Sequence, residues 1–273
     1  DHSNGDGIRI VRVDGSAESN TNTINSVDDD GIYIGEVRGT VKFLFQPAEE
    51  GPSEPLHGEH DHIGALAMVD AGVLDNPKVD AVFGLHMIPA FPVGAIGYRP
   101  GPILASGDTF TIKVSGRQTH GGFPGNGIDP IVGSAQIVLG LQTIVSRQLN
   151  LTKEPAIISI GSIHGGNREN IIPETVELLG TLRPFDDGTR EDTMARMRTT
   201  AESIAQASGA KAEVSFAKPG YSTTVNDADL TARMLPTMQQ VTGGKAVLAP
   251  KLSASEDFSE FSKKVPGVFF FLG

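Results

Sequence analysis

The order of strand and helix signals after residue 105 restricts the fold more than any other feature. Alternating apolar residues predict strands at 110–114, 156–163, 175–182 and 211–216. Between them, Asp129-Pro130 is typical of a helix start, and a second amphipathic run at 194–208 stops at Gly209. The resulting order, β-α-β-β-α-β, is that of a ferredoxin-like α+β unit.

The flanking segments predict a different architecture. Buried strands at 41–45 and 79–85 enclose a helical pattern at 63–71, which suggests a βαβ unit and a mostly parallel sheet flanked by helices. The last strand, 268–272, ends almost at the last residue. We therefore expect an α/β domain formed by residues 1–105 and 218–273, incomplete at both ends, with the ferredoxin-like domain 106–217 inserted into it.

Composition limits the classes of function. The 273-residue chain has a formal net charge of −11, which argues against binding nucleic acid or an anionic membrane. It contains no Cys, so thiolate metal sites and Cys nucleophiles are excluded. No apolar run approaches the roughly 18 residues of a membrane span, and no signal peptide is visible, so we expect a cytoplasmic protein.

Three residues at strand ends could carry chemistry. Glu49 and Glu50 follow the strand 41–45, and His86 comes directly after the strand 79–85. Ligands of open α/β sheets bind at the carboxyl ends of strands, where two carboxylates and an imidazole could hold a divalent metal. One Glu could ligate while the other moves a proton. The alternative is a solvated Glu pair and a satisfied, buried His.

Several strings along the chain resemble one known family in the right order. They are GTVKFLFQPAEEG (39–51), FGLH (83–86), GAIGYRPGP (94–102), THGGFP (119–124), DPIV (129–132), NIIP (170–173), GTLRPF (180–185), SEDFSEF (255–261) and VPGVFFFLG (265–273). The chain resembles metal-dependent amidohydrolases of the aminoacylase, hippurate hydrolase and auxin-conjugate hydrolase type. This family belongs to the carboxypeptidase and aminoacylase group of metallopeptidases.

The resemblance implies roles for particular residues. Glu49 matches the general base that activates water, and Glu50 and His86 match metal ligands. His120 matches a histidine of the inserted domain that serves the partner subunit's active site and helps to stabilise the oxyanion. Asn170 and Arg183 match positions that hold the substrate carboxylate and its polar neighbours, and a guanidinium fork suits a carboxylate. The inserted domain then acts as a lid and dimerisation domain of a catalytic domain.

Two parts of the family pattern are not matched. The N-terminal motif of metal-binding His and Cys or Asp residues is absent, and the last metal His of the family lies beyond the position where this chain ends. The loop 57–62 offers His57, His60 and His62 as replacement ligands, although a solvated polar loop is the simpler interpretation.

These observations together predict a metal-dependent hydrolase or peptidase. We expect it to cleave the amide bond of N-acyl amino acids or similar small carboxylate-bearing amides. It would use one or two divalent ions (zinc, manganese or nickel) and form a homodimer. One alternative is a non-catalytic dimerising or ligand-binding relative without a complete metal site. Another is a dipeptidase or carboxypeptidase of the same group.

Overall fold

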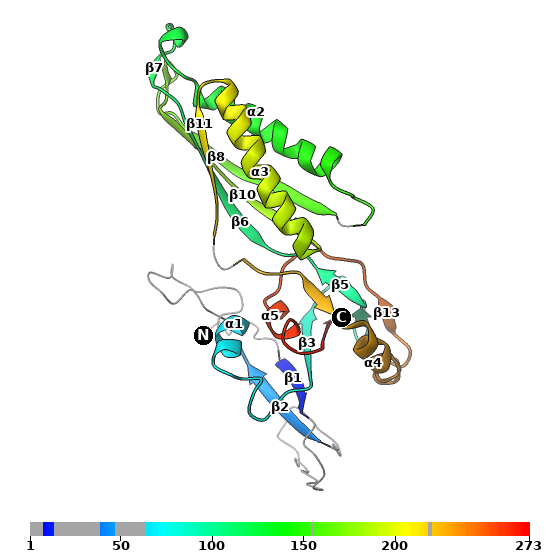
Figure 1. Cartoon of the computed structure of the whole chain (residues 1–273). Helices are drawn as coiled ribbons and strands as arrows, with labels where there is room; N and C mark the ends of the chain where they lie inside the picture. Colours follow the sequence, from blue (N-terminus) through cyan, green and yellow to red (C-terminus); the bar gives the residue numbers. More distant parts are fainter. Residues whose placement is uncertain (1–7, 14–38, 47–63, 154, 218–219) are drawn as a thin grey trace. The chain divides into compact units, whose positions relative to one another are not determined.

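The computed structural model describes residues 8–13, 39–46, 64–153, 155–217 and 220–273 (Figure 1). The chain divides into two compact units. The first comprises residues 1–103, 224–250 and 257–273, and the second comprises residues 104–223 and 251–256. Segment 251–256 joins the second unit because its backbone is bound there: the amide of Ala105 donates to the carbonyl of Leu252 at 3.1 Å.

A six-stranded sheet in the order β13-β4-β14-β3-β1-β2 forms the centre of the first unit. Its strands are β1 (Ile8–Val13), β2 (Thr40–Phe45), β3 (Ala81–Met87), β4 (Ile96–Tyr98), β13 (Ala246–Leu248) and β14 (Gly267–Leu272). The pairs β3–β14 and β4–β13 are parallel, whereas β4–β14, β1–β3 and β1–β2 are antiparallel. The unit belongs to the predicted α/β class, and its sheet is mixed.

Strand β1 changes the arrangement that the βαβ pattern predicts. It pairs antiparallel with β2 on one side and with β3 on the other. Strands β2 and β3 therefore run in the same direction, as a βαβ unit requires, but they are not neighbours. A small two-stranded sheet of β5 (Gly101–Leu104) and β12 (Thr224–Asn226) lies where the chain leaves and re-enters this unit.

Within the described residues of the first unit, three helices accompany the sheet: α1 (Gly64–Asp70), α4 (Ala228–Val241) and α5 (Ser259–Ser262). Asp227 caps α4, because its side chain accepts a hydrogen bond from the Leu230 amide at 2.6 Å. Helix α4 buries Leu230 and Met238 against the sheet. Within the described parts of the chain, no helix combines the length and the apolar character that crossing a membrane requires.

The second unit has the predicted ferredoxin-like fold. Its antiparallel sheet has the order β11-β6-β10-β8, and helices α2 and α3 cover one face of it (Figure 1). The bounds are β6 (Asp108–Ser115), α2 (Pro130–Thr143), β8 (Ala156–Gly165), β10 (Thr175–Pro184), α3 (Asp187–Ala207) and β11 (Lys211–Phe216). Phe110, Ile112 and Val114 alternate toward the helices and are fully buried there.

Helix α2 begins where the sequence predicts, whereas α3 begins at Asp187, well before the predicted run 194–208. The carboxylate of Asp129 accepts hydrogen bonds from the amides of Ile131 and Val132, with Pro130 at the first helical position. A short π-helix, η2 (Ile144–Gln148), extends α2. At one end of the unit, β7 (Thr119–His120), the turn η1 (Pro124–Asn126) and β9 (Ile171–Ile172) form a small antiparallel structure.

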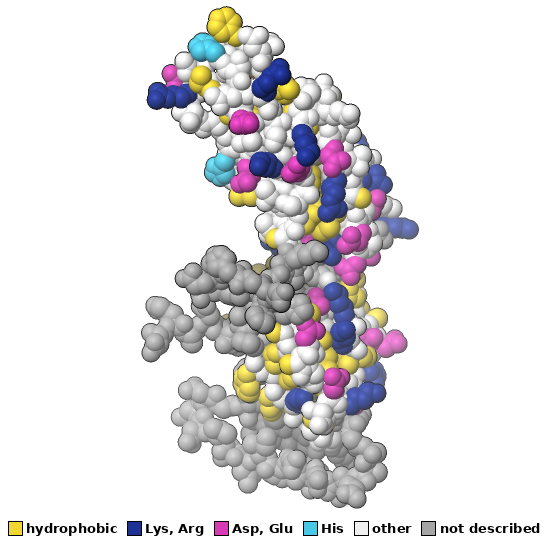
Figure 2. Space-filling view, turned by 60° about the vertical axis from the view of Figure 1, so that its left-hand side comes forward, with side chains coloured by type: hydrophobic (Ala, Val, Ile, Leu, Met, Phe, Trp, Pro, Cys, Tyr) yellow, Lys and Arg dark blue, Asp and Glu magenta, His cyan; other side chains and the backbone are white. Residues whose placement is uncertain are grey.

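Charged side chains of both signs are interspersed over the described surface shown in Figure 2. Lys and Arg lie next to Asp and Glu there, so this face carries no large area of a single sign. Some described residues of opposite charge form ion pairs, such as Arg196 with Asp192 at 2.7 Å on α3. Local pairing therefore accounts for part of the surface charge.

Candidate active site

Two predicted site residues, Glu49 and Glu50, lie outside the described residues, and so do His57, His60 and His62. The structure describes the chain on both sides of them. Gln46 follows β2 and is buried, and Gly64 and Ala65 begin α1 and are buried.

His86 lies near the end of β3, opposite Phe271 of β14, and its side chain is exposed. Its Nδ1 atom is 2.8 Å from the carbonyl oxygen of Met87. A carbonyl oxygen only accepts hydrogen bonds, so Nδ1 carries the hydrogen, and the neutral ring then presents the lone pair of Nε2 to the surroundings. This is the tautomer that a histidine needs to bind a metal through Nε2, with the other nitrogen oriented by a backbone carbonyl.

A complete metal site is not formed by the described residues alone. Among them, no group of three or more His, Asp or Glu side chains is placed to hold an ion. His86 fits one ligand position, and the predicted ligand Glu50 lies outside the described part of the chain. Buried Asp257 is held by protein groups: its Oδ2 accepts from the Ala65 amide at 2.8 Å and from the Gln46 side chain.

From the sequence alone, Glu256 and Asp257 are most simply interpreted as a pair at a helix start that the helix dipole stabilises, although in the family that the chain resembles this turn lies near the metals. Both are buried, and α5 begins at Ser259. The Asp257 carboxylate binds the start of α1, almost two hundred residues away along the chain. A contact of that range leaves no local signal in the sequence.

In the second unit, the structure brings His120 and Asn170 together. His120 pairs with Ile171 across β7 and β9, and the Gly121 amide donates to the Asn170 carbonyl at 2.7 Å. The Gly122 amide donates to His120 Nδ1 at 3.0 Å, so Nδ1 holds the lone pair and Nε2 carries the hydrogen. His120 is exposed and therefore presents a hydrogen-bond donor, the opposite of His86.

Arg183 is half-buried near the end of β10, opposite Ile157 of β8. Its Nη1 atom donates to the carbonyl oxygen of Ser253 at 3.0 Å. A purely structural role for Arg183 would be an ion pair with a nearby Asp or Glu, and the described residues contain no such pair. A backbone carbonyl fixes one edge of the guanidinium and leaves its positive charge without a carboxylate among these residues.

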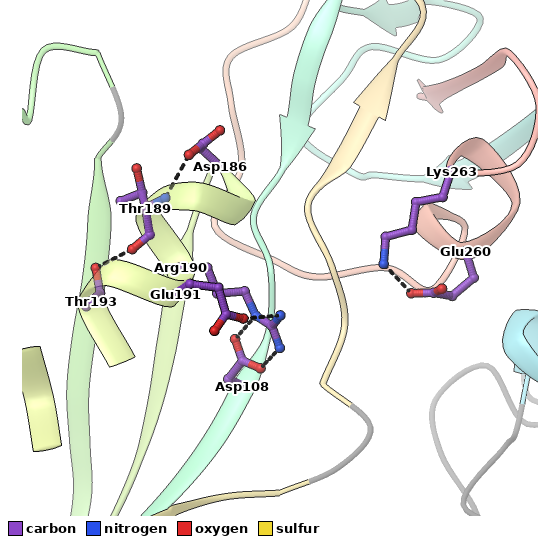
Figure 3. Close-up of polar contacts among 8 residues, drawn as sticks. All are labelled: Asp108, Asp186, Thr189, Arg190, Glu191, Thr193, Glu260 and Lys263. Carbon is purple, nitrogen blue, oxygen red and sulfur yellow. Dashed lines mark hydrogen bonds and ion pairs between the residues drawn. The ribbon is translucent and has the colours of Figure 1, made fainter. Parts of the chain in front are cut away.

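Sequence reasoning missed a largely buried ion pair with two hydrogen bonds, between Asp108 of β6 and Arg190 of α3 (Figure 3). Arg190 Nε and Nη2 donate to the two carboxylate oxygens at 2.7 Å and 2.5 Å. These hydrogen bonds raise the pKa of Arg190, against the opposing effect of burial. The pair ties the first strand of the second unit to α3 and is a structural feature.

The strand predicted at 156–163 would leave His164 in an exposed turn, but β8 continues to Gly165 and pairs His164 with Glu177 of β10. The pairing of β8 with β10 has a register shift between Leu179 and Gly180. The side chain is exposed, and no other predicted site residue is its strand partner.

Residues 34–273 match the model of a family described as peptidase family M20/M25/M40. Because the match takes in most of the chain, the chain belongs to this family, and the predicted resemblance to the metallopeptidase and aminoacylase group is confirmed. Among curated proteins, the chain is 38% identical over 237 residues to thermostable carboxypeptidase 1 of Saccharolobus solfataricus. It is 37% identical over 238 residues to N-acetylcysteine deacetylase of Bacillus subtilis.

These alignments include 87% of this chain but only 57% and 59% of the two relatives, so the chain spans less than two thirds of their length. Among solved structures, a putative aminohydrolase from methicillin-resistant Staphylococcus aureus is 30% identical with a TM-score of 0.72, covering 84% of this chain and 56% of that one. The Bacillus subtilis YXEP protein, described as a dinuclear metal binding peptidase, is 34% identical with a TM-score of 0.66, covering 84% and 54%.

Proposed function

We propose that this chain is part of a metal-dependent hydrolase that cleaves the amide bond of N-acyl amino acids or similar small carboxylate-bearing amides. The observation that carries this proposal is the family match over residues 34–273. Relatives named as N-acetylcysteine deacetylase of Bacillus subtilis and IAA-amino acid hydrolase ILR1-like 4 of Arabidopsis thaliana support the substrate class.

In this proposal the chain's own residues divide the work. Glu50 and His86 hold a divalent ion, zinc, manganese or nickel, and the Nε2 lone pair of His86 suits this role. When bound, such an ion polarises the scissile carbonyl and acidifies water. Glu49 takes the proton of the attacking water and passes it to the leaving amine. His120 donates from Nε2 to the developing oxyanion.

Arg183 and Asn170 would bind the substrate's free carboxylate and its polar neighbours. The guanidinium has one edge fixed by Ser253, and its charge is not neutralised by a carboxylate among the described residues. A planar fork held in this way favours a carboxylate ligand over a neutral amide. A substrate carboxylate would therefore meet a cation that is already oriented.

The direct test of the proposal is Glu49→Gln in the native protein. The variant should retain its metal and lose at least about a hundredfold in turnover of N-acyl amino acids, because the amide cannot accept the water's proton. Glu202→Gln, at an exposed position of α3, is the matched control and should keep the parent rate. Turnover near the parent rate in Glu49→Gln would refute the assignment.

A dipeptidase or carboxypeptidase activity is the second candidate. It is favoured by the relative with 38% identity, which is named a carboxypeptidase. A panel of N-acyl amino acids and unblocked dipeptides, compared by kcat/KM, separates the two candidates. A preference for dipeptides would replace the first proposal while keeping the family and the role of Glu49.

We also propose that the second unit forms a homodimer with a second copy. Strand β8 is an edge of the sheet, and α2 contacts β8 whereas α3 contacts β11 at the other edge. Helix α2 exposes Ile131, Val132 and Leu139, and Leu139 is 71% exposed. An unpaired edge beside apolar side chains is a surface that a two-fold pairing would cover.

Leu139→Glu tests this dimer by placing a charge on the proposed interface. We expect it to shift the protein toward monomer in sedimentation, whereas Leu248→Glu, at a leucine of β13 that is 61% exposed, should leave the parent state unchanged. A parent protein that sediments as a monomer at micromolar concentration would refute the proposal.

A mixing experiment tests whether His120 serves the partner's site. Glu49→Gln and His120→Ala variants are each expected to be inactive. Random exchange of equal amounts of the two variants would make about half of the dimers mixed. Each mixed dimer would have one intact site out of two, so the mixture should recover about a quarter of the parent activity. If His120 acts within its own subunit, mixing restores nothing.

A further inference from the structure

An exposed phenylalanine lies beside His120 in the second unit. Phe123 directly precedes the turn η1 and is 64% exposed. Its ring centroid is 5.7 Å from that of His120, and the two ring planes are inclined at 48°. Among the described residues, His120 is the only aromatic partner of this ring. The core that the sheet forms with α2 and α3 does not include Phe123, so packing within the unit does not account for it.

Hydrogen bonds of the backbone fix Phe123 relative to His120. The Phe123 amide donates to the His120 carbonyl at 2.8 Å. The Phe123 carbonyl accepts from the Asn126 amide at 3.0 Å and from Thr119 Oγ1 at 3.2 Å. The Gly122 amide holds the His120 ring itself through Nδ1. One hydrogen-bonded turn therefore carries both residues, and a ligand bound to Nε2 of His120 lies close to Phe123.

The distance between the two rings matches the size of an acyl group. In the proposed function, Nε2 of His120 donates to the oxygen of the scissile carbonyl. Such a hydrogen bond spans about 2.9 Å and the C=O bond about 1.2 Å, so the first acyl carbon lies roughly 4–5 Å from Nε2. The ring centroids of His120 and Phe123 are 5.7 Å apart. An acyl group longer than acetyl can therefore contact the Phe123 ring while its carbonyl oxygen stays bound to His120.

The elements around His120 offer different surfaces to the two halves of a substrate. Asn170, which we propose to bind the amino-acid half, reaches the turn from β9, where its carbonyl accepts from the Gly121 amide at 2.7 Å. Phe123 is instead bound to Thr119 and His120 of β7. A polar amide suits the half that carries the carboxylate, whereas an apolar ring suits a group without charge. The acyl half is therefore the part that matches Phe123.

We propose that Phe123 is a specificity-determining residue that binds the acyl group of the substrate, an inference that rests on the proposed hydrolase function. The preferred substrates are then N-acyl amino acids whose acyl group is apolar and larger than acetyl. Contact with such a group removes apolar surface of the exposed ring from water, which is favourable only when the acyl group is itself apolar. An acetyl group is too short to cover the ring and gains little from it.

The test measures kcat/KM of the native protein and of Phe123→Ala for N-acetyl, N-hexanoyl and N-phenylacetyl derivatives of one amino acid. The hexanoyl-to-acetyl and phenylacetyl-to-acetyl ratios should fall by about tenfold, while the acetyl substrate should stay within about twofold, because one apolar contact is worth about that much selectivity. Phe123→Leu keeps an apolar side chain and should lose about threefold or less for hexanoyl. The control is Leu248→Ala, at an exposed leucine of β13 in the first unit, which should change neither ratio.

Two further comparisons separate binding of the acyl group from general damage. N-acetyl derivatives of alanine, valine and leucine vary the amino-acid half alone, and their relative kcat/KM should not change in Phe123→Ala. Phe123→Lys should produce a gain: the succinyl-to-hexanoyl ratio should rise by at least about tenfold, because the ammonium attracts the second carboxylate of succinyl and the apolar ring is gone. A protein that is merely destabilised would not acquire a new preference.

Each contrary result has a distinct meaning. An unchanged hexanoyl-to-acetyl ratio in Phe123→Ala would overturn the proposal, and so would a change confined to the amino-acid series. An equal loss for every substrate, together with dissociation in sedimentation, would overturn it by placing Phe123 at a contact between subunits. A native protein without amidase activity would contradict the proposed function instead. Calorimetric affinities of the parent and Phe123→Ala for the same acyl series would then decide the role of Phe123.

Discussion

Breaking the ion pair between Asp108 and Arg190 should destabilise the second unit more than any other single loss of charge among its described residues. Arg190→Met keeps much of the side-chain length and removes both hydrogen bonds to the carboxylate. The side chain of Asp108 is 1% exposed and that of Arg190 is 20% exposed. The variant therefore leaves a carboxylate buried without its cation.

The expected loss follows from this burial. Removing one partner of a buried ion pair costs about 3–5 kcal/mol, mainly because the other charge stays buried and unpaired. Glu191 also lies 3.5 Å from Arg190, but it is 73% exposed and contributes little. Adding Asp108→Leu removes the stranded charge, so the double variant should recover most of the loss.

The pH dependence of this contribution has a definite sign. The pKa of Arg190 is raised in the folded state, first of all by its hydrogen bonds to Asp108. A raised pKa means that the stabilisation is complete below the ordinary arginine pKa and is lost only as the pH rises through the folded value. Across the neutral range the arginine therefore stays charged, and its contribution should not change.

Urea denaturation followed by circular dichroism measures these differences, and hydrogen exchange in β6 and α3 assigns them to the second unit. The control is Arg196→Met on the same helix, where the ion pair with Asp192 is 40% and 49% exposed and should contribute less than about 0.5 kcal/mol. If Arg190→Met costs no more than Arg196→Met, or if the double variant is as unstable as Arg190→Met alone, the reasoning is wrong.

Three further predictions follow from other contacts. Arg183→Lys keeps the charge but loses the fork, so KM should rise for N-acyl amino acids and not for their amides; equal effects on both would indicate a structural role. Asn226→Ala should destabilise the first unit by about 3 kcal/mol or more in urea denaturation, because buried backbone groups of Arg99 and Phe269 lose their partner, whereas exposed Asn150→Ala should be neutral. Hydrogen bonding lowers the pKa of Glu213 and raises that of Lys211. The small loss of stability caused by Lys211→Met should therefore vanish in high salt, and also at acidic pH where Glu213 becomes protonated; a loss that stays the same under these conditions would contradict the prediction.

The second unit was predictable because its signals are local. Asp129 and Asp186 cap the two helices within three residues of themselves, and alternation along β6 and β10 separates buried from exposed side chains. Neighbouring elements along the chain also pack together in this fold. Propensity, capping and burial therefore point to the same answer, which is the condition under which sequence patterns predict structure.

The sheet of the first unit was less predictable because its pairings are long-range. Nothing in the pattern of residues 8–13 indicates that this strand lies between β2 and β3, about thirty and seventy residues further along the chain. Strand β14 pairs with β3 across an even longer separation. Periodicity identifies a strand and its buried side, but the choice of partner depends on which apolar faces meet.

The candidate site shows the same division. The place of His86 at a strand end follows from periodicity, and the family resemblance adds His120, Asn170 and Arg183. The buried carboxylates of Asp108 and Asp257 escaped prediction because their partners are Arg190, Gln46 and Ala65, each far away along the chain. A charged residue in a sequence is read as exposed unless its partner is known, and these partners become known only in the folded unit.

The two site histidines show what a motif alone leaves open. His86 and His120 are both exposed residues of short or terminal strand segments, yet their rings carry the hydrogen on opposite nitrogens. The carbonyl of Met87 sets the hydrogen of His86 on Nδ1, and the amide of Gly122 sets that of His120 on Nε2. Both partners are backbone groups, so the path of the chain just after each histidine decides between a lone pair that suits a metal and a donor that suits an oxyanion. In the proposed function, the different roles of these two histidines would therefore depend on local backbone geometry, which residue type and spacing do not report.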